Sequence, residues 1–346
     1  MGNDHLVEPR PISAYARDLK GALGPEVFSP ARNRLAWFAL HVAVAAGAIA
    51  AIAAGVGGML GALALAPIIG LAFGGLSFVG HETLHGAVVR RPGLRLLIGW
   101  VCFLPFCLSP RHWIAWHNRV HHGHAMQPGV DPDAYPTLED YRSSWILRAA
   151  DRFSVGRWRL LGAMSLLLGF TGQSNQTFWR SGRRFLSARE YPLAVAETVL
   201  GWAFWLALAW RLGPFGFLCA YGIPLLIANC IVMAHILTNH SLSPLTEVND
   251  PLLNSLSVTA PRWLSVYTLD FGLHVEHHLF PSMSSVHAPR VRDELVRRWP
   301  ERYQSMPLFS ALARLFQTAR VYKTATTLTD PRDGREFEAL LPRKAA

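Results

Sequence analysis

Eight of the 15 histidines in this chain of 346 residues lie in three short clusters. The clusters read HETLH from His81, HNRVHH from His117 and HVEHH from His274. Imidazole is the commonest metal ligand in proteins, and residues three or four apart on a helix share a face. The clusters therefore predict a site in which several imidazole rings converge on bound metal.

The number of these rings predicts two metal ions, because eight ligands are too many for one ion that must also keep positions open for chemistry. In the second cluster we expect the first two histidines to face one metal and the last to reach a neighbouring metal. In the third cluster we expect His274 and His277 to lie on the same face of a helix, and His278 to point away from that face. A ninth candidate occurs in the sequence TNHS. The predicted metal ligands are His81, His85, His117, His121, His122, His240, His274, His277 and His278.

Metal-bound imidazoles usually donate their second N–H to a carboxylate or a carbonyl oxygen. Of the acidic residues near the clusters, Glu276 is the best placed for this role, and the others are Glu82, Asp131, Asp133 and Asp270. The predicted ligands include no thiolate, which argues against an iron–sulfur cluster or a structural zinc site. Iron that activates dioxygen suits the site best, while zinc and copper accept the same ligands.

The elements that must position these histidines are apolar helices. Of all residues, 51% are hydrophobic and 16% are charged. Runs close to the length of about 20 residues that crosses a bilayer predict an all-α integral membrane protein with four transmembrane helices in two hairpins. The run 94–108 is too short and contains Pro105, so we expect it to be re-entrant or interfacial. The predicted spans are residues 35–54, 59–79, 193–210 and 214–237.

The chain divides around these spans into a cytosolic N-terminal segment (1–34), a membrane domain (35–280) and a cytosolic C-terminal extension (281–346). All but one of the 33 Lys and Arg residues lie outside the two hairpins, the exception being Arg211. Because positive residues are retained in the cytosol, both termini and all three clusters are predicted to face it. Orientation thus explains the net charge of +10, and we expect no nucleic-acid partner.

Two other functions fit parts of the pattern. The first cluster also satisfies HExxH, in which two histidines bind zinc and the glutamate acts as the general base of a protease. That function leaves the second and third clusters unexplained. A histidine-rich metal transporter should place its ligands within the spans near mid-membrane, whereas these clusters lie at the ends of spans and in loops.

The ordered set HxxxH, HxxxHH and HxxHH, split by one transmembrane hairpin, resembles the membrane fatty acid desaturase family. The likeness extends from the second span through the region after the third cluster. It implies a four-helix stem under a cytosolic helical cap that holds two iron ions, with the three clusters and His240 as ligands. Three further motifs add to it: Asp131-Pro132-Asp133, Asn239-His240 and Phe280-Pro281.

The activity implied by this resemblance is oxygen-dependent desaturation of a fatty acyl chain in a lipid, with dioxygen as co-substrate. Diiron hydroxylases and ketolases of acyl chains, alkanes or carotenoids remain alternatives, because ligand spacing does not encode the product. The chain has no His-Pro-Gly-Gly motif of a fused cytochrome b5 domain. Electrons are therefore expected from a separate carrier of the ferredoxin or cytochrome b5 type. A composition heavy in Ala, Arg, Gly and Leu favours a bacterial inner membrane over the endoplasmic reticulum.

Overall fold

A computed structural model describes residues 8–19, 21–157 and 159–342 of the protein, so the outermost residues of both predicted terminal segments lie outside the described part. The fold is mostly helical and separates into two compact units. We call the first the histidine unit; it comprises Met1–Ser29, His117–Ser165 and Ala234–Ala346. The second, the apolar unit, comprises Pro30–Trp116 and Leu166–Met233.

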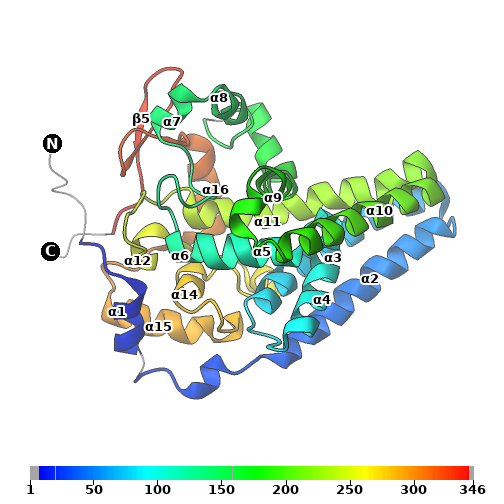
Figure 1. The fold of residues 1–346 in the computed structure, drawn as a ribbon, viewed down its shortest axis with the longest axis horizontal. Coiled ribbons are helices and arrows are strands. Elements are labelled where there is room, and N and C mark those ends of the chain that lie inside the picture. The colour runs from blue at the N-terminus through cyan, green and yellow to red at the C-terminus, as the bar shows by residue number, and fades with distance from the viewer. Residues whose placement is uncertain (1–7, 20, 158, 343–346) are drawn as a thin grey trace. The chain divides into compact units, whose positions relative to one another are not determined.

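Long helices over the four predicted spans build the apolar unit. α2 and α3 form a hairpin and lie side by side in Figure 1. Their turn contains Gly55, Gly57 and Gly58 at positive φ, a conformation that glycine adopts without strain. A Cβ atom on Gly75 would lie 2.2 Å from the His41 ring, so the two helices are in close contact. The long helices are α2 (Leu35–Ala53), α3 (Gly58–Leu84), α4 (Pro92–Phe103), α9 (Ala163–Phe185), α10 (Glu190–Phe217) and α11 (Ile223–His240).

The third and fourth predicted spans form a second hairpin. Gly213 has φ 69° and ψ 174°, which interrupts the helical path near the end of α10. The rings of Trp205 and Tyr221 then stack with their centroids 4.2 Å apart. These residues are sixteen positions apart and would be about 24 Å apart along one straight helix. The chain therefore folds back at Gly213, close to the predicted break.

The short apolar run 94–108 is broken. It comprises α4, the turn η3 (Leu104–Phe106) and Cys107, whose φ of 50° lies in the left-handed region. The chain then enters α5 (Pro110–Trp113). Three helical stretches of the described residues have the length and composition to cross a membrane, or four if Pro92–Phe106 and Pro110–His124 count as one broken span.

The histidine unit consists of short helices and, against the all-α prediction, of short strands as well. β1 and β2 pair in parallel, while β3, β4 and β5 form an antiparallel sheet. Each strand has two or three residues, too few for an alternating pattern to be visible in the sequence. The strands are β1 (Ser257–Thr259), β2 (Ser305–Pro307), β3 (Val321–Tyr322), β4 (Thr327–Thr329) and β5 (Glu336–Glu338).

One hydrophobic core of this unit joins its N-terminal part to the region around the third cluster. Tyr15 and Leu19 of α1 pack with Val291 and Leu295 of α15, all four being fully buried. The amphipathic face of α15 is therefore covered within the unit. The short helices are α1 (Ile12–Leu19), α6 (His122–His124), α7 (Leu138–Ser143), α8 (Trp145–Asp151), α12 (Pro251–Asn254), α13 (Arg262–Tyr267), α14 (His274–Leu279), α15 (Ala288–Arg298) and α16 (Leu308–Gln317).

Candidate metal centre

The second histidine cluster lies on a π-helix, η4 (Ile114–His121), that leads into α6. Because a π-helix repeats near every fifth residue, it brings residues i and i+5 together. His117 Nε2 lies 3.2 Å from His122 Nε2, whereas His121 joins a different set of rings. The predicted grouping is wrong in separating His122 from His117, because it assumed an α-helical repeat, whereas His117 and His121, together with Asp133, do lie close enough to share one ion.

The third cluster forms α14, and its predicted grouping is also wrong. His274 Nε2 and His278 Nε2, four residues apart, lie 3.2 Å from each other. His277 Nε2 instead lies 3.1 Å from His122 Nε2. On an α-helix, positions i and i+4 differ by about 40° in direction, against about 60° for i and i+3. The first and last histidines of α14 therefore form the closer pair.

His240, at the end of α11, joins the ring pair of α14. Its Nε2 lies 2.8 Å from His274 Nε2, and its Nδ1 lies 3.1 Å from the main-chain oxygen of Asn254. A carbonyl accepts only from N–H, so this contact places the proton of the ring on Nδ1 and leaves Nε2 as a ligand atom. Asn254, which was not predicted, fixes a candidate ligand through its backbone, a role that no side-chain pattern reveals.

Seven histidines of this unit thus fall into two neighbouring groups. The ligand atoms of the second group all lie within 4.8 Å of one another, and its rings are buried. His122 and His278 stack with their centroids 4.2 Å apart, which places the two groups side by side. The first group is His117, His122 and His277, and the second group is His121, His240, His274 and His278.

The spacing of these nitrogen atoms fits metal ligation. His274 Nε2 faces two other Nε2 atoms, and so does His122 Nε2. A ring nitrogen carries either one proton or one lone pair, so it cannot form both contacts as ordinary hydrogen bonds. Nitrogen ligands about 2.1 Å from an ion and at right angles to each other are about 3 Å apart, which matches the observed 2.8–3.2 Å.

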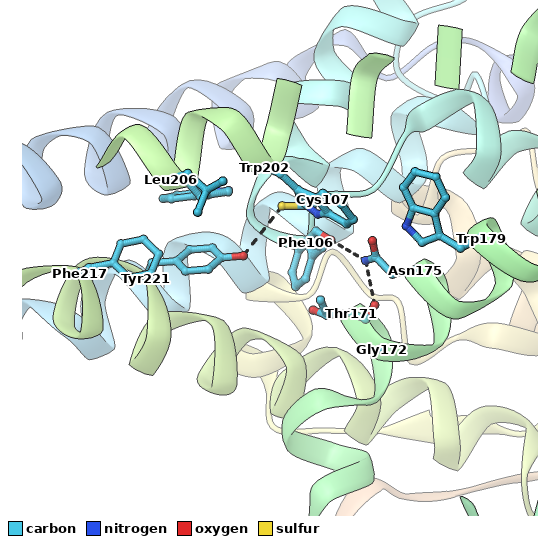
Figure 2. Close-up of a pocket in the computed structure, with 11 residues that line it drawn as sticks. Phe106, Cys107, Thr171, Gly172, Asn175, Trp179, Trp202, Leu206, Phe217 and Tyr221 are labelled. Atoms are coloured by element: carbon cyan, nitrogen blue, oxygen red, sulfur yellow. Dashed lines mark hydrogen bonds between the residues drawn. The ribbon is translucent and has the colours of Figure 1, made fainter. Parts of the chain in front are cut away.

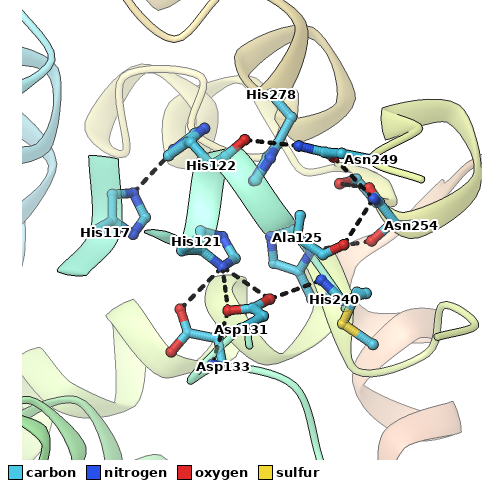
Figure 3. A network of polar contacts seen from close by, with 12 residues as sticks. His117, His121, His122, Ala125, Asp131, Asp133, His240, Asn249, Asn254 and His278 are labelled. Carbon is cyan, nitrogen blue, oxygen red and sulfur yellow. Dashed lines mark hydrogen bonds and ion pairs between the residues drawn. The ribbon is translucent and has the colours of Figure 1, made fainter. Parts of the chain in front are cut away.

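Asp131 orients His121 (Figure 3). The Nδ1 atom of His121 lies 3.0 Å and 3.2 Å from the two carboxylate oxygens of Asp131, and 3.3 Å from an oxygen of Asp133. Burial by itself would lower the pKa of His121, but the two carboxylates outweigh it and raise the pKa to about 9. The pair holds a proton on Nδ1 and turns the opposite edge of the ring toward His240 and His278, whose centroids lie 4.8 Å and 5.0 Å away.

Glu276 does not take the role predicted for it. Its carboxylate accepts hydrogen bonds from Ser257 Oγ at 2.7 Å and from Tyr303 Oη at 2.6 Å, and these are its side-chain partners among the described residues. Ser257 Oγ in turn accepts from the main-chain N–H groups of His274 and Val275, each at 3.1 Å. Glu276 therefore anchors the first turn of α14 instead of binding an imidazole.

The two remaining acidic candidates are engaged elsewhere. Glu82 lies 3.4 Å from Arg34 within the apolar unit. Asp270 lies 3.8 Å from Arg262 within the histidine unit. Asp131 and Asp133 both contact a predicted ligand histidine, His121.

The first cluster lies in the apolar unit, at the C-terminal end of α3. The rings of His81 and His85 are buried, with centroids 4.8 Å apart. Each ring also meets the Trp113 ring edge-on at 5.3 Å. The helix therefore presents both imidazoles on one face, as the i, i+4 spacing predicts.

Buried Arg320 is a further residue that the sequence did not single out. Its guanidinium donates to the main-chain oxygen of Ser241 and to Thr318 Oγ1. Ser241 directly follows His240, so this arginine holds the chain where it leaves the second group. An arginine in a polar C-terminal extension carries no signal that distinguishes it from a solvated one.

Long apolar helices and seven converging imidazoles define a helical membrane protein with a histidine site suited to metal. The chain belongs to the fatty acid desaturase family, whose sequence profile matches residues 58–310. The predicted family is thereby confirmed, and the protein is an oxidoreductase.

Curated relatives are also desaturases. The chain is 23% identical over 310 residues to the chloroplastic omega-6 fatty acid desaturase of Spinacia oleracea, covering 87% of this chain and 68% of that one. It is 21% identical over 277 residues to the sn-1 oleoyl-lipid 12-desaturase of Anabaena variabilis, covering 72% and 75%. It is 27% identical over 234 residues to the chloroplastic sn-2 acyl-lipid omega-3 desaturase (ferredoxin) of Helianthus annuus, covering 63% and 52%.

Proposed function

We propose that this protein is an oxygen-dependent diiron desaturase that introduces a double bond into an acyl chain of a membrane lipid. The observation that carries this proposal is the division of the histidine rings into two neighbouring groups, within a chain of the fatty acid desaturase family. Two groups of neutral nitrogen ligands suit two iron ions with positions left open for chemistry. Bound iron, dioxygen and two electrons would together supply the oxidising power to remove hydrogen from two adjacent methylenes.

We assign the first group to one iron and the second group to the other, and we keep His81 and His85 as proposed iron ligands because the family resemblance implies them. The protein itself has to hold the imidazoles in one tautomer and to orient them. The carboxylate of Asp131 does this for His121, and the main-chain oxygen of Asn254 does it for His240. Such partners of ligating imidazoles are typically worth 10–100-fold in metal affinity.

We further propose that the substrate is an acyl chain esterified in a lipid. Two of the relatives are named for lipid-linked chains, one as an sn-1 oleoyl-lipid and one as an sn-2 acyl-lipid enzyme. The name of the second specifies ferredoxin, which supports a separate carrier of the ferredoxin or cytochrome b5 type as the electron donor. The distribution of arginine supports a cytosolic site and cytosolic termini, and the composition heavy in Ala, Arg, Gly and Leu supports a bacterial inner membrane.

Lipid mass spectrometry of a host that expresses the chain tests this function. We expect acyl chains that are lighter by two hydrogens, and iron in the purified protein. His121→Ala and His277→Ala, one from each group, should abolish the product and lower the iron content. His287→Ala, a histidine outside the clusters, should change neither.

The same measurement separates the alternatives. Acyl chains that gain an oxygen would identify a hydroxylase or a ketolase in place of a desaturase. A purified protein without iron, together with unchanged host lipids, would refute the proposed function.

A further inference from the structure

The apolar unit contains a cavity of about 550 Å³ that has no histidine among its lining residues (Figure 2). Its volume lies within the range of about 300–1,000 Å³ that is usual for ligand sites. The cavity lies between α9, α10 and the segment before α11 and is open on one side. Large apolar and aromatic side chains dominate its wall: Phe106, Trp179, Trp202, Leu206, Phe217 and Tyr221.

Three polar donors of the wall are already engaged within the protein, whereas the buried Asn175 Oδ1 has no hydrogen-bond partner among the described residues. Asn175 Nδ2 donates to the main-chain oxygens of Phe106 and Thr171, at 3.1 Å and 2.9 Å. Tyr221 Oη donates to Pro105 O at 3.0 Å, and Trp205 Nε1 donates to Leu104 O at 2.7 Å. With these groups satisfied, the cavity offers an apolar surface to its occupant.

Charge appears at one end of this cavity. Thr171, Asn175 and Trp179 of α9 line it at intervals of four residues, and Arg183 continues the same face one turn further along. The guanidinium of Arg183 lies over the ring of Tyr191 on α10, 5.0 Å from its centroid. Trp179 and Trp202, with centroids 5.6 Å apart, lie between this pair and the interior of the cavity. The cavity therefore extends from the cationic side chain of Arg183, past the indole rings of Trp179 and Trp202, to an apolar interior.

Arg183 has a charge available for a ligand. No carboxylate lies within ion-pair distance of it in the described chain, and the side chain is exposed. Tryptophan is enriched where a membrane meets water, and arginine near a membrane attracts anionic lipid.

We propose that this cavity binds one acyl chain of an anionic membrane lipid, with the phosphate of the head group held by Arg183. The aromatic wall provides apolar contact for the chain, and the cation selects lipids that carry a net negative head group. This lipid site has no residue in common with the histidine groups and does not rest on the proposed function. Its failure would leave that function untouched.

Lipid titration of the purified, detergent-solubilised protein, followed by native mass spectrometry, tests the site. The probes are phosphatidylglycerol, phosphatidylcholine and oleate. The test variants are Leu206→Trp, which fills the cavity from an exposed position on α10, and Arg183→Gln. The matched controls are Leu200→Trp, also exposed on α10, and Arg184→Gln, next to Arg183 on α9.

We expect the wild type to retain one phosphatidylglycerol in preference to phosphatidylcholine. Arg183→Gln should raise the apparent Kd for phosphatidylglycerol roughly tenfold or more, the value of a hydrogen bond to a charged group, and should raise that for phosphatidylcholine less, because its choline offsets the charge of the phosphate. Leu206→Trp should weaken the binding of both lipids, and the control variants should behave like the wild type.

Four results would overturn the proposal. Equal binding of phosphatidylglycerol and phosphatidylcholine would show that Arg183 does not select the lipid. Equal effects of Arg184→Gln and Arg183→Gln on phosphatidylglycerol binding would show the same. Undiminished binding by Leu206→Trp would place the lipid outside the cavity. Oleate that displaces phosphatidylglycerol at equal concentration would identify a free fatty acid as the ligand. Because Arg183 is exposed, its variant reports on the site even if Leu206→Trp fails to fold.

Discussion

Replacing Asp131 with asparagine tests how the protein orients a candidate ligand. The side chain is buried and accepts from His121 Nδ1. Its two oxygens also accept main-chain N–H groups, from Met126 at 2.8 Å and from Asp133 at 3.0 Å. Both oxygens are therefore committed as acceptors, and asparagine can replace only one of them. Its amide NH2 group must face one of the two backbone donors.

The size of the effect follows from these contacts. A buried donor left without an acceptor costs about 1–3 kcal/mol, so we expect a loss of that order in the free energy of unfolding. His121 also loses a charged acceptor and keeps at most a neutral one. Outer partners of metal-bound imidazoles are worth about 10–100-fold in metal affinity, which corresponds to about 1.4–2.7 kcal/mol.

The assay is iron retention by the purified protein against increasing chelator, together with thermal unfolding. Asp131→Asn should release iron at a chelator concentration roughly 10–100-fold lower than the wild type does, and should unfold at a lower temperature. Asp293→Asn, the same change at an exposed position on α15, serves as the control. Iron retention equal to that of the wild type would refute the assignment of Asp131 as the residue that positions His121.

Three further predictions concern the histidine unit. Arg302→Met should lower the free energy of unfolding by about 3–5 kcal/mol, because it leaves the buried Asp250 carboxylate, 2.6 Å from Arg302, without its charged partner. Adding Asp250→Asn should recover part of this loss, as measured by chemical denaturation. Gly272→Ala should lower the melting temperature by bringing a Cβ atom to 2.4 Å from Val258 O, whereas Gly21→Ala, with open space around it, should not. Hydrogen bonding to Arg332 lowers the pKa of Asp330 to about 2, so its ionised form stabilises the fold above its ordinary pKa of about 3.8 and loses this effect as the pH falls toward 2. Asp330→Asn should therefore lower the free energy of unfolding by about 1 kcal/mol at neutral pH, a small loss because Arg332 is half exposed and solvent screens the pair. In melting experiments the difference from the wild type should shrink below about pH 4.

The sequence predicts the parts of this protein that depend on composition and length. Apolar runs of the right length marked the helices, and the gaps between these runs marked both hairpin turns, where the structure has glycines at residues 55–58 and at Gly213. The clustering of histidines identified a candidate metal site because so many imidazoles rarely occur together for another reason. These signals are local, so they can be read from a single chain.

The grouping of the rings could not be predicted in the same way. The spacing HxxxHH is compatible with an α-helix and with a π-helix, and only the second joins His117 to His122. The contacts of Glu276 depend on Ser257 and Tyr303, which approach it from other parts of the chain. A carboxylate inside a cluster therefore looks like a partner of imidazole until its tertiary neighbours are known.

The contact of His122 with His277 has a consequence for chain entropy. The two residues are separated by 155 positions in the sequence. An ion bound by both would act as a cross-link that closes a very long loop. A disulfide across a loop of 100 residues is worth about 4.7 kcal/mol through restriction of the unfolded chain, and the gain rises only slowly with length. An ion at this position would thus tie the fold together, and the cross-link could form only after His277 has left the ribosome.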